Sequence, residues 1–179
     1  MRVITGTARG RRLREPEGTA IRPTADSVKE TIFNTIQFDI EGRRALDLFA
    51  GTGQLGIEAL SRGAASCVFV DESTEAVRLV RANLAACGLS GTVVQTESLG
   101  YLAGCGRFDL IFLDPPYDTG LLDKALQNVI KFDRLSVGGI LVCESRRDKA
   151  MPDVPAPYCK TRERGYGRIK LTLYKREAE

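Results

Sequence analysis

Hydrophobic and polar positions change period several times between residues 44 and 145. Short apolar runs predict five strands, at residues 44–49, 66–70, 92–96, 108–113 and 140–145. Apolar residues spaced three or four positions apart predict helices at residues 56–62, 73–87 and 121–130, with Ser73 as an N-cap and Gly88 as a stop. Strands that alternate with helices predict a mostly parallel sheet wrapped by helices on both faces.

The N-terminal part of the chain departs from this alternation. Residues 1–13 mix small, apolar and basic residues around Gly6 and Gly10, which predicts an edge strand or a hairpin. Thr24, after Pro23, is suited to cap a following helix whose first turn contains an acidic residue.

The C-terminal part also differs. Residues 158–164 and 168–175 predict two strands joined at residues 165–167, and such a pair would complete the sheet as an antiparallel edge. We therefore expect a basic N-terminal extension at residues 1–23 and one α/β domain at residues 24–179, acting as a monomer.

Composition excludes several classes of protein. The chain has 179 residues, of which 43% are hydrophobic and 27% charged, and this is typical of a globular domain. No apolar run approaches the roughly 20 residues of a membrane span, and residues 1–6 lack the apolar segment of a secretory signal. The absence of histidine excludes Ser-His-Asp and Cys-His catalytic pairs and His-ligated zinc. The five cysteines form no Cys-x-x-Cys pair, so we expect no metal and a cytoplasmic location.

The net charge of +3 is unevenly distributed. Basic side chains exceed acidic ones by three in residues 1–44 and by four in residues 144–179, whereas acidic ones exceed basic ones by four in between. Basic ends around an acidic middle suit a polyanion held by both ends of the chain, and equally suit a solvated basic surface.

A glycine-rich segment follows the first predicted strand. Residues 47–56 read Asp-Leu-Phe-Ala-Gly-Thr-Gly-Gln-Leu-Gly, and a glycine turn between a strand and a helix lets a ligand approach the backbone. Asp71, at the end of the second strand, could accept from both ribose hydroxyls of a nucleoside. The candidate cofactor contacts of the loop are Asp47, Phe49, Gly51, Thr52 and Gly53.

The acidic residue at the start of this loop separates two kinds of nucleotide cofactor. A pyrophosphate would lie at the helix N-terminus, where the carboxylate of Asp47 would repel it. The same carboxylate suits the ammonium group of S-adenosylmethionine, which has no phosphate. Glu97 and Ser98 follow the third strand and could meet the adenine, with Glu97 accepting from its amine and a backbone N–H reaching a ring nitrogen. A Glu-Ser pair can also simply begin a helix.

The fourth strand ends in Asp114, Pro115, Pro116 and Tyr117. Two prolines fix the backbone and remove amide donors, so the carbonyls there can only accept. An exocyclic amine could donate to the Asp114 carboxylate and the Pro115 carbonyl while Tyr117 stacks on its ring. Holding both N–H groups would aim the nitrogen lone pair at a sulfonium methyl, and alignment of this kind can supply roughly 7–11 kcal/mol.

These residues resemble those of class I S-adenosylmethionine-dependent methyltransferases that modify amines through an (Asp/Asn)-Pro-Pro-(Tyr/Phe) motif. The chain also resembles the RsmD family, which methylates N2 of one guanine in bacterial 16S ribosomal RNA. The resemblance runs nearly end to end, with the most specific segments at residues 22–34 and 60–64. The matching segments are residues 4–6, 10–13, 22–34, 47–56, 58–64, 114–117, 144–145 and 166–167.

The resemblance implies a Rossmann-like fold with a seven-stranded, mostly parallel sheet and an antiparallel edge strand. It implies S-adenosyl-L-methionine as cofactor, Asp71 on its ribose, and 16S rRNA of the small ribosomal subunit as partner; Glu97 stands where relatives commonly have Asp or Asn. The basic extension would contact RNA. The candidate phosphate-binding residues are Arg2, Arg9, Arg11, Arg12, Arg14 and Arg22.

Three other functions remain open from the sequence. Adenine-N6 methylation of DNA or RNA is possible because the tetrapeptide recognises an amine and does not itself distinguish adenine from guanine. An NAD-dependent dehydrogenase would leave Asp47 and the Asp-Pro-Pro-Tyr segment unexplained. A non-catalytic RNA-binding module is the third. Methylation of protein glutamine is disfavoured because that motif usually begins with Asn where this chain has Asp114.

Overall fold

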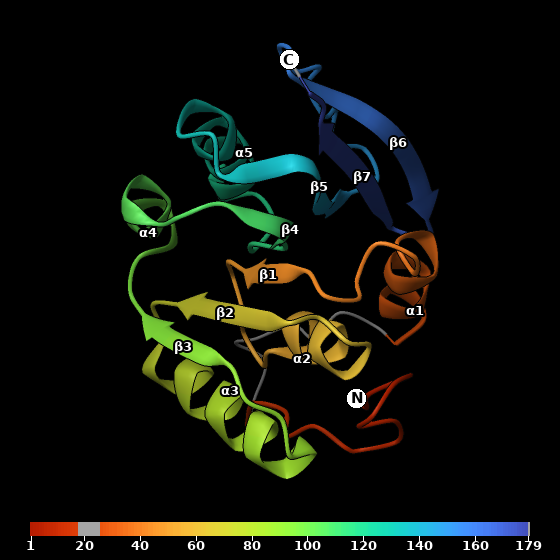
Figure 1. The fold of residues 1–179 in the computed structure, drawn as a ribbon, viewed down its shortest axis with the longest axis vertical. Helices are drawn as coiled ribbons and strands as arrows, with labels where there is room; N and C mark the ends of the chain where they lie inside the picture. The colour runs from red at the N-terminus through yellow and green to blue at the C-terminus, as the bar shows by residue number, and fades with distance from the viewer. Residues whose placement is uncertain (18–25, 179) are drawn as a thin grey trace.

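A seven-stranded sheet forms the centre of the protein (Figure 1). The structure is a computed structural model that describes residues 1–17 and 26–178. Its strand order is β3-β2-β1-β4-β5-β7-β6, and β1 to β5 are parallel. The strands are β1 (Arg44–Asp47), β2 (Ser66–Asp71), β3 (Thr92–Gln95), β4 (Phe108–Leu113), β5 (Leu135–Arg146), β6 (Tyr158–Tyr166) and β7 (Ile169–Arg176). The expected fold class is confirmed, and the reversed strand, β7, lies between β5 and the edge strand β6.

Helices cover both faces of the sheet. Side chains of successive strand residues point to opposite faces, so Leu110 and Phe112 join one buried cluster while Ile111 and Leu113 join the other. The first cluster packs against α1 (Asp26–Thr35), α2 (Gln54–Ser61) and α3 (Thr74–Cys87), and the second against α4 (Ser98–Gly104) and α5 (Leu121–Lys131).

The predicted ends of α3 are confirmed, and α2 begins two residues earlier than expected. The Ser73 hydroxyl accepts from the Ala76 N–H, and Gly88 ends α3 in the left-handed conformation at φ 64°. Gly53, at φ 79°, makes the turn from the loop directly into α2, so the helix starts at Gln54.

Two elements differ from the expectation. The apolar pattern predicted no helix at residues 98–104, where Gly100 and Gly104 lower helix propensity, and only the Glu-Ser pair indicated that a helix could begin there. α4 forms there because the Glu97 carboxylate caps it and the Leu102 side chain is fully buried. β5 begins at residue 135 rather than 140. Its first residues pair with the start of β4, and a register shift between the two strands accommodates residues 138 and 139 within β5.

The first residues form a hairpin outside the sheet. A bridge joins Arg2 to Arg12, and Val3, Ala8 and Leu13 are buried against α1, α2 and α3. The hairpin expectation is therefore confirmed, and the edge-strand alternative is wrong because residues 1–13 pair with each other and form no strand of the seven-stranded sheet. Thr24, the expected N-cap of α1, lies outside the described residues.

Polar groups of α2 fix the hairpin in place. The fully buried Glu58 carboxylate accepts from the backbone N–H groups of Ile4 and Thr5 at 2.8 and 3.0 Å, and from Arg62 Nε at 2.8 Å. The Ser61 hydroxyl donates to the Thr5 carbonyl and accepts from the Ala8 N–H. These hydrogen bonds replace the ones to water that the Glu58 carboxylate loses on burial. The hairpin is therefore an integral part of the packed structure.

We expect Gly6→Ala to detach this hairpin. Gly6 has φ +90°, and a Cβ at this position would lie 1.7 Å from the Ser61 carbonyl oxygen. Gly10→Ala is the matched control, because Gly10 also has positive φ, at +81°, but a Cβ there has nothing within 4 Å. The control carries only the backbone cost of about 1–2 kcal/mol. Gly6→Ala should lose roughly 1–3 kcal/mol more; equal thermal unfolding curves for the two variants would refute this packing.

Candidate active site

A cavity of about 620 Å³ opens at the carboxyl ends of the parallel strands. The strand order reverses between β1 and β4, and ligands of open α/β sheets bind where such a reversal occurs. Ten of the predicted cofactor and catalytic residues line this cavity. They are Phe49, Gly51, Thr52, Asp71, Glu97, Ser98, Asp114, Pro115, Pro116 and Tyr117.

Asp71 connects the glycine loop to the loop after β2. Its Oδ2 accepts from the Gly51 N–H and its Oδ1 from the Ser73 N–H, both at 2.9 Å. Each carboxylate oxygen has a second lone pair, so both oxygens can still accept from a pair of hydroxyl groups in the cavity. The geometry suits a ribose held at the end of β2.

Asp47 and Gly53 lie outside the residues that line the cavity. Asp47 is only 2% exposed, and its Oδ2 accepts from the Gly56 N–H at 3.0 Å beneath the loop. Burial, together with a smaller contribution from the charge of Asp71, raises the pKa of Asp47 to about 7 against the opposing effect of the Gly56 hydrogen bond. The sequence had assigned to Asp47 a contact with the cofactor ammonium, whereas in this geometry its carboxylate supports the turn from the loop into α2.

This raised pKa gives a pH-dependent expectation for Asp47→Asn. Between about pH 4 and pH 7, Asp47 ionises in the unfolded chain but stays protonated when folded, so wild-type stability falls through that window. The asparagine can keep an acceptor for Gly56 and has no charge to bury. We expect its free energy of unfolding to match the wild type near pH 4 and to exceed it above pH 7, by at most about 4 kcal/mol.

Urea unfolding at several pH values measures this difference. Glu30→Gln, which neutralises an exposed carboxylate on α1, is the control for the loss of one negative charge. A constant difference between Asp47→Asn and wild type from pH 4 to pH 8 would contradict the assignment.

Glu97 and Ser98 begin α4 next to the end of β1. The Glu97 carboxylate accepts from the N–H groups of Leu99 and Gly100, and the Ser98 hydroxyl donates to the Leu48 carbonyl at 2.8 Å. The two interpretations of the Glu-Ser pair, as a helix start and as an adenine contact, are therefore compatible, because the pair begins α4 and also lines the cavity.

The Asp-Pro-Pro-Tyr segment forms the wall of the cavity beyond β4. The Tyr117 hydroxyl donates to Glu144 Oε1 at 2.6 Å, and Glu144 stands near the end of the neighbouring strand β5 at 6% exposure. This bond fixes the orientation of the tyrosine ring, because it holds the far end of the side chain to a rigid strand.

Sequence reasoning missed several residues of the cavity. Glu144 was noted only as part of the family resemblance, although an acidic residue at the end of an apolar strand is itself a signal of function. Val28 and Tyr166 also appeared only within segments of the family resemblance, and Arg168 and Ile169 gave no signal, because only the sheet order brings them to the cavity.

The predicted RNA-binding arginines of the N-terminal hairpin are all exposed. Arg2, Arg9, Arg11, Arg12 and Arg14 lie between or beside the buried residues of the hairpin, so their side chains face outward. Arg22 lies outside the described residues.

Within residues 1–17 and 26–178, no helix is both long enough and apolar enough to cross a membrane. The same residues contain no cluster of three or more acidic or cysteine side chains that could hold a metal ion.

The whole length of the chain is similar to proteins of one family. The family model described as "Conserved hypothetical protein 95" matches residues 1–175. Ribosomal RNA small subunit methyltransferase D of Escherichia coli is 35% identical over 100% of this chain and 91% of its own. The Bacillus subtilis protein YlbH is 40% identical over 98% of this chain and 99% of its own.

Solved structures share the fold. The Escherichia coli protein yhhF has a TM-score of 0.89 at 35% identity, covering 100% of this chain and 99% of its own. The Thermus thermophilus 16S rRNA N2 methyltransferase RsmC, solved with AdoMet and guanosine, has a TM-score of 0.65 at 21% identity, covering 87% of this chain and 44% of its own. The second likeness concerns the fold alone.

Proposed function

The chain belongs to the RsmD family of ribosomal RNA methyltransferases, and we propose that it transfers a methyl group from S-adenosyl-L-methionine to the N2 amine of a guanine in 16S rRNA. The single observation that carries the proposal is that one cavity contains both the glycine loop after β1 and the Asp-Pro-Pro-Tyr segment after β4. β1 and β4 are adjacent and parallel, so a cofactor on the loop and an amine on the tetrapeptide would meet.

The charge of the cavity supports this cofactor over a dinucleotide. Among the described residues that line it, six are acidic and only Arg168 is basic. A cavity of this kind repels a pyrophosphate and attracts the cationic ammonium and sulfonium groups of S-adenosylmethionine. The acidic lining consists of Asp71, Glu72, Glu75, Glu97, Asp114 and Glu144.

We assign the cofactor to the half of the cavity formed by β1, β2 and β3. Asp71 would accept from the ribose hydroxyls, and Glu97 and Ser98 would meet the adenine. Phe49, Gly51 and Thr52 would line the part of the cavity that holds the cofactor. Gly53 and Asp47 would maintain the conformation of the glycine loop. When bound, the cofactor supplies an electrophilic methyl group.

We assign the target base to the other half. The Asp114 carboxylate and the Pro115 carbonyl would accept the two N–H bonds of the exocyclic amine, and the Tyr117 ring would stack on the base. Because Glu144 holds the tyrosine hydroxyl, the stacking surface is already oriented before the base arrives. The amine nitrogen becomes acidic only on methylation, and the Asp114 carboxylate is positioned to take the released proton.

Methyl transfer to unmodified small ribosomal subunits tests the proposal. Subunits from a strain that lacks the modification are incubated with the protein and labelled cofactor, and the methylated nucleoside is identified by mass spectrometry. N2-methylguanosine in 16S rRNA is expected. N6-methyladenosine would favour the adenine-specific alternative, and tighter calorimetric binding of NAD than of S-adenosylmethionine would favour the dehydrogenase.

We assign the basic hairpin at residues 1–17 to contacts with RNA. It carries five exposed arginines, and contacts with phosphates position a protein on RNA without recognising its sequence. Deleting the hairpin is a poor test, because its loss would also uncover Glu58 and part of the core. Substitution of the arginines leaves the buried side intact.

A further inference from the structure

Six of the seven cations of the C-terminal hairpin, residues 158–176, fall into two groups, and the seventh, Lys175, is exposed near the end of β7. Lys160, Lys170 and Arg176 each lie within ion-pair distance of a carboxylate. Arg162, Arg164 and Arg168 are exposed, and no carboxylate of the described chain forms an ion pair with them. Exposed arginines without a carboxylate partner keep their charge and donors for an external ligand.

Two of these arginines form a row that leads to the cavity. In β6 they pair with Leu173 and Leu171 of β7, and Tyr166 pairs with Ile169. Paired residues of antiparallel strands share a face, so Arg162, Arg164 and Tyr166 lie on one face with about 6.6 Å between successive positions. Tyr166 lines the cavity, so the row ends in the proposed active site.

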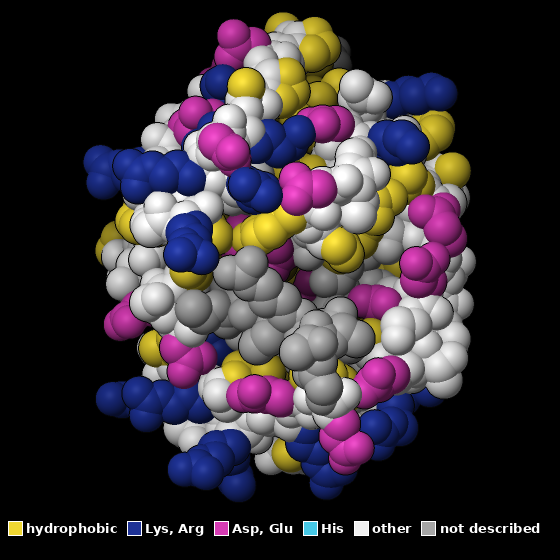
Figure 2. Space-filling view, turned by 180° about the vertical axis from the view of Figure 1, so that it is seen from behind, with side chains coloured by type: hydrophobic (Ala, Val, Ile, Leu, Met, Phe, Trp, Pro, Cys, Tyr) yellow, Lys and Arg dark blue, Asp and Glu magenta, His cyan; other side chains and the backbone are white. Residues whose placement is uncertain are grey.

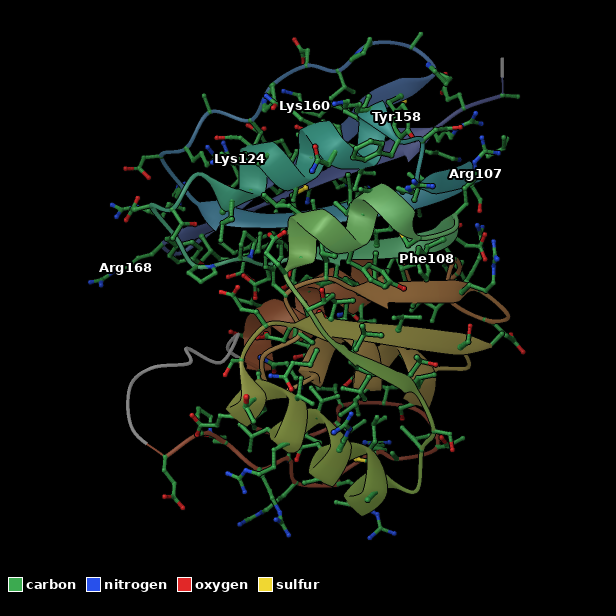
Figure 3. The ribbon with its side chains drawn as sticks, turned by 90° about the vertical axis from the view of Figure 1, so that its left-hand side faces the viewer. Arg107, Phe108, Lys124, Tyr158, Lys160 and Arg168 are labelled. Atoms are coloured by element: carbon green, nitrogen blue, oxygen red, sulfur yellow. The ribbon has the colours of Figure 1, made fainter. Side chains whose placement is uncertain are left out.

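The third arginine stands at the mouth of the cavity, beyond the turn. Arg168 lines the cavity and projects from the carboxyl ends of the strands, at the opposite end of the molecule from Arg107 (Figure 3). A polyanion that follows the β6 row would therefore meet a further cation where it enters.

The turn that carries Arg168 is held in one conformation. The Arg147 guanidinium donates to the Gly167 carbonyl at 3.1 Å, and the Arg147 backbone N–H donates to the Arg168 carbonyl at 3.0 Å. A Cβ on Gly165 would lie 3.1 Å from Arg147 Nε, so only glycine leaves this side chain in place without displacement. A turn fixed in this way loses little conformational freedom when it binds a ligand.

Charge separates the mouth from the interior. The charged residues of the cavity lining are acidic apart from Arg168, so phosphates are repelled from the interior and are held more favourably outside it. Figure 2, which faces this end of the molecule, shows Lys and Arg side chains interspersed with Asp and Glu over the upper half, where β5, β6 and β7 lie, and further Lys and Arg side chains at the lower end near α3.

We propose that Arg162, Arg164 and Arg168 form a phosphate-binding track that guides single-stranded RNA along the edge strand β6 into the cavity at Tyr166. The proposal rests on the proposed function, because it supplies the path by which the target nucleotide reaches Asp114. A competing role for charges on an edge strand is to prevent pairing with the edge strand of another copy.

The test is the salt dependence of RNA binding by the full chain. The probe is a short single-stranded RNA of mixed sequence, with KCl varied from about 50 to about 200 mM. The double substitution Arg162→Ala, Arg164→Ala should weaken binding and reduce the slope of log K against log salt by about 1.4, or about 0.7 per phosphate contact. The double substitution Arg162→Lys, Arg164→Lys keeps both charges and should keep the slope.

A control removes two cations elsewhere, one of which, Arg107, is ion-paired with Asp133. Arg107→Ala with Lys131→Ala takes two cations from the opposite end of the sheet, next to the start of β4, and should leave the slope unchanged. Calorimetric binding of S-adenosylmethionine, expected to be equal in all variants, verifies that each is folded.

The outcomes separate this proposal from the proposed function. If the wild type methylates small subunits but the alanine pair leaves the slope unchanged, the track is refuted and the methyltransferase remains. An alanine pair that self-associates in sedimentation while binding RNA normally identifies the arginines as edge protection. If the lysine pair loses RNA binding as fully as the alanine pair, charge is not the determinant and the track is also refuted. A wild type that neither binds nor methylates RNA overturns both.

Discussion

Asp114→Ala should abolish detectable methyl transfer while leaving the affinity for S-adenosylmethionine little changed. The carboxylate is assigned to the amine of the base, at the end of β4, whereas the cofactor is assigned to the loops after β1, β2 and β3. Without it the amine keeps only one fixed acceptor, and its lone pair is no longer aimed at the methyl group. Misplacement of about 1 Å can cost a hundredfold in rate, so we expect a fall in kcat of at least about that size.

Single-turnover methylation of small subunits, with cofactor binding measured in parallel, checks this expectation. Asp114→Asn keeps one carbonyl acceptor and should retain part of the rate. Asp118→Asn is the charge-matched control, because Asp118 lies in the same loop but faces a second cavity and pairs with Arg146. Unimpaired turnover by Asp114→Ala would remove the central residue of the proposed site.

Asp71→Ala should produce the largest loss of cofactor affinity. The side chain does two things at once, since it accepts from the N–H groups of Gly51 and Ser73 and is assigned to the ribose hydroxyls. A hydrogen bond to a charged group contributes about 1.5–3 kcal/mol, and its loss alone corresponds to about tenfold or more in affinity. The freed loops should add to this loss, because they would have to be ordered again on binding.

Isothermal titration with S-adenosylmethionine measures the effect. Glu72→Ala is the control, since the neighbouring carboxylate also lines the cavity but is expected to act only through its charge. Asp71→Asn, which keeps one acceptor oxygen, should fall between wild type and Asp71→Ala. Similar affinities for Asp71→Ala and Glu72→Ala would mean that the ribose assignment is wrong and that only the acidity of the cavity matters.

Local signals explain why much of the fold could be predicted. The apolar period of each strand and helix is set by neighbouring residues, and so are the cap at Ser73 and the stop at Gly88. The prediction failed where distant contacts outweigh local preference. α4 forms despite two glycines because Leu102 is buried under the sheet, and β5 extends past Gly138 because Leu135 pairs with Phe108.

The candidate site likewise has features that depend on local sequence and features that depend on distant contacts. The glycine loop and the Asp-Pro-Pro-Tyr segment are contiguous, so their chemistry could be inferred from residue types alone. The direction of the Asp47 carboxylate could not be inferred, because it depends on the N–H of Gly56, a first-turn donor of α2 that has no acceptor within the helix. Nor could the hydrogen bond from Tyr117 to Glu144, which joins residues 27 positions apart, one in the loop after β4 and the other in β5.

The sequence by itself therefore determined the fold class, the two segments that meet in the cavity and the family. These depend on short-range periodicity and on side-chain chemistry, which can be inferred from the sequence without knowledge of the packing. The tertiary structure alone decided how the N-terminal hairpin docks on Glu58 and that β7 enters between β5 and β6. It alone brought Tyr166 and Arg168 to the cavity, because strand order is chosen by the burial of whole faces and is not encoded in any one segment.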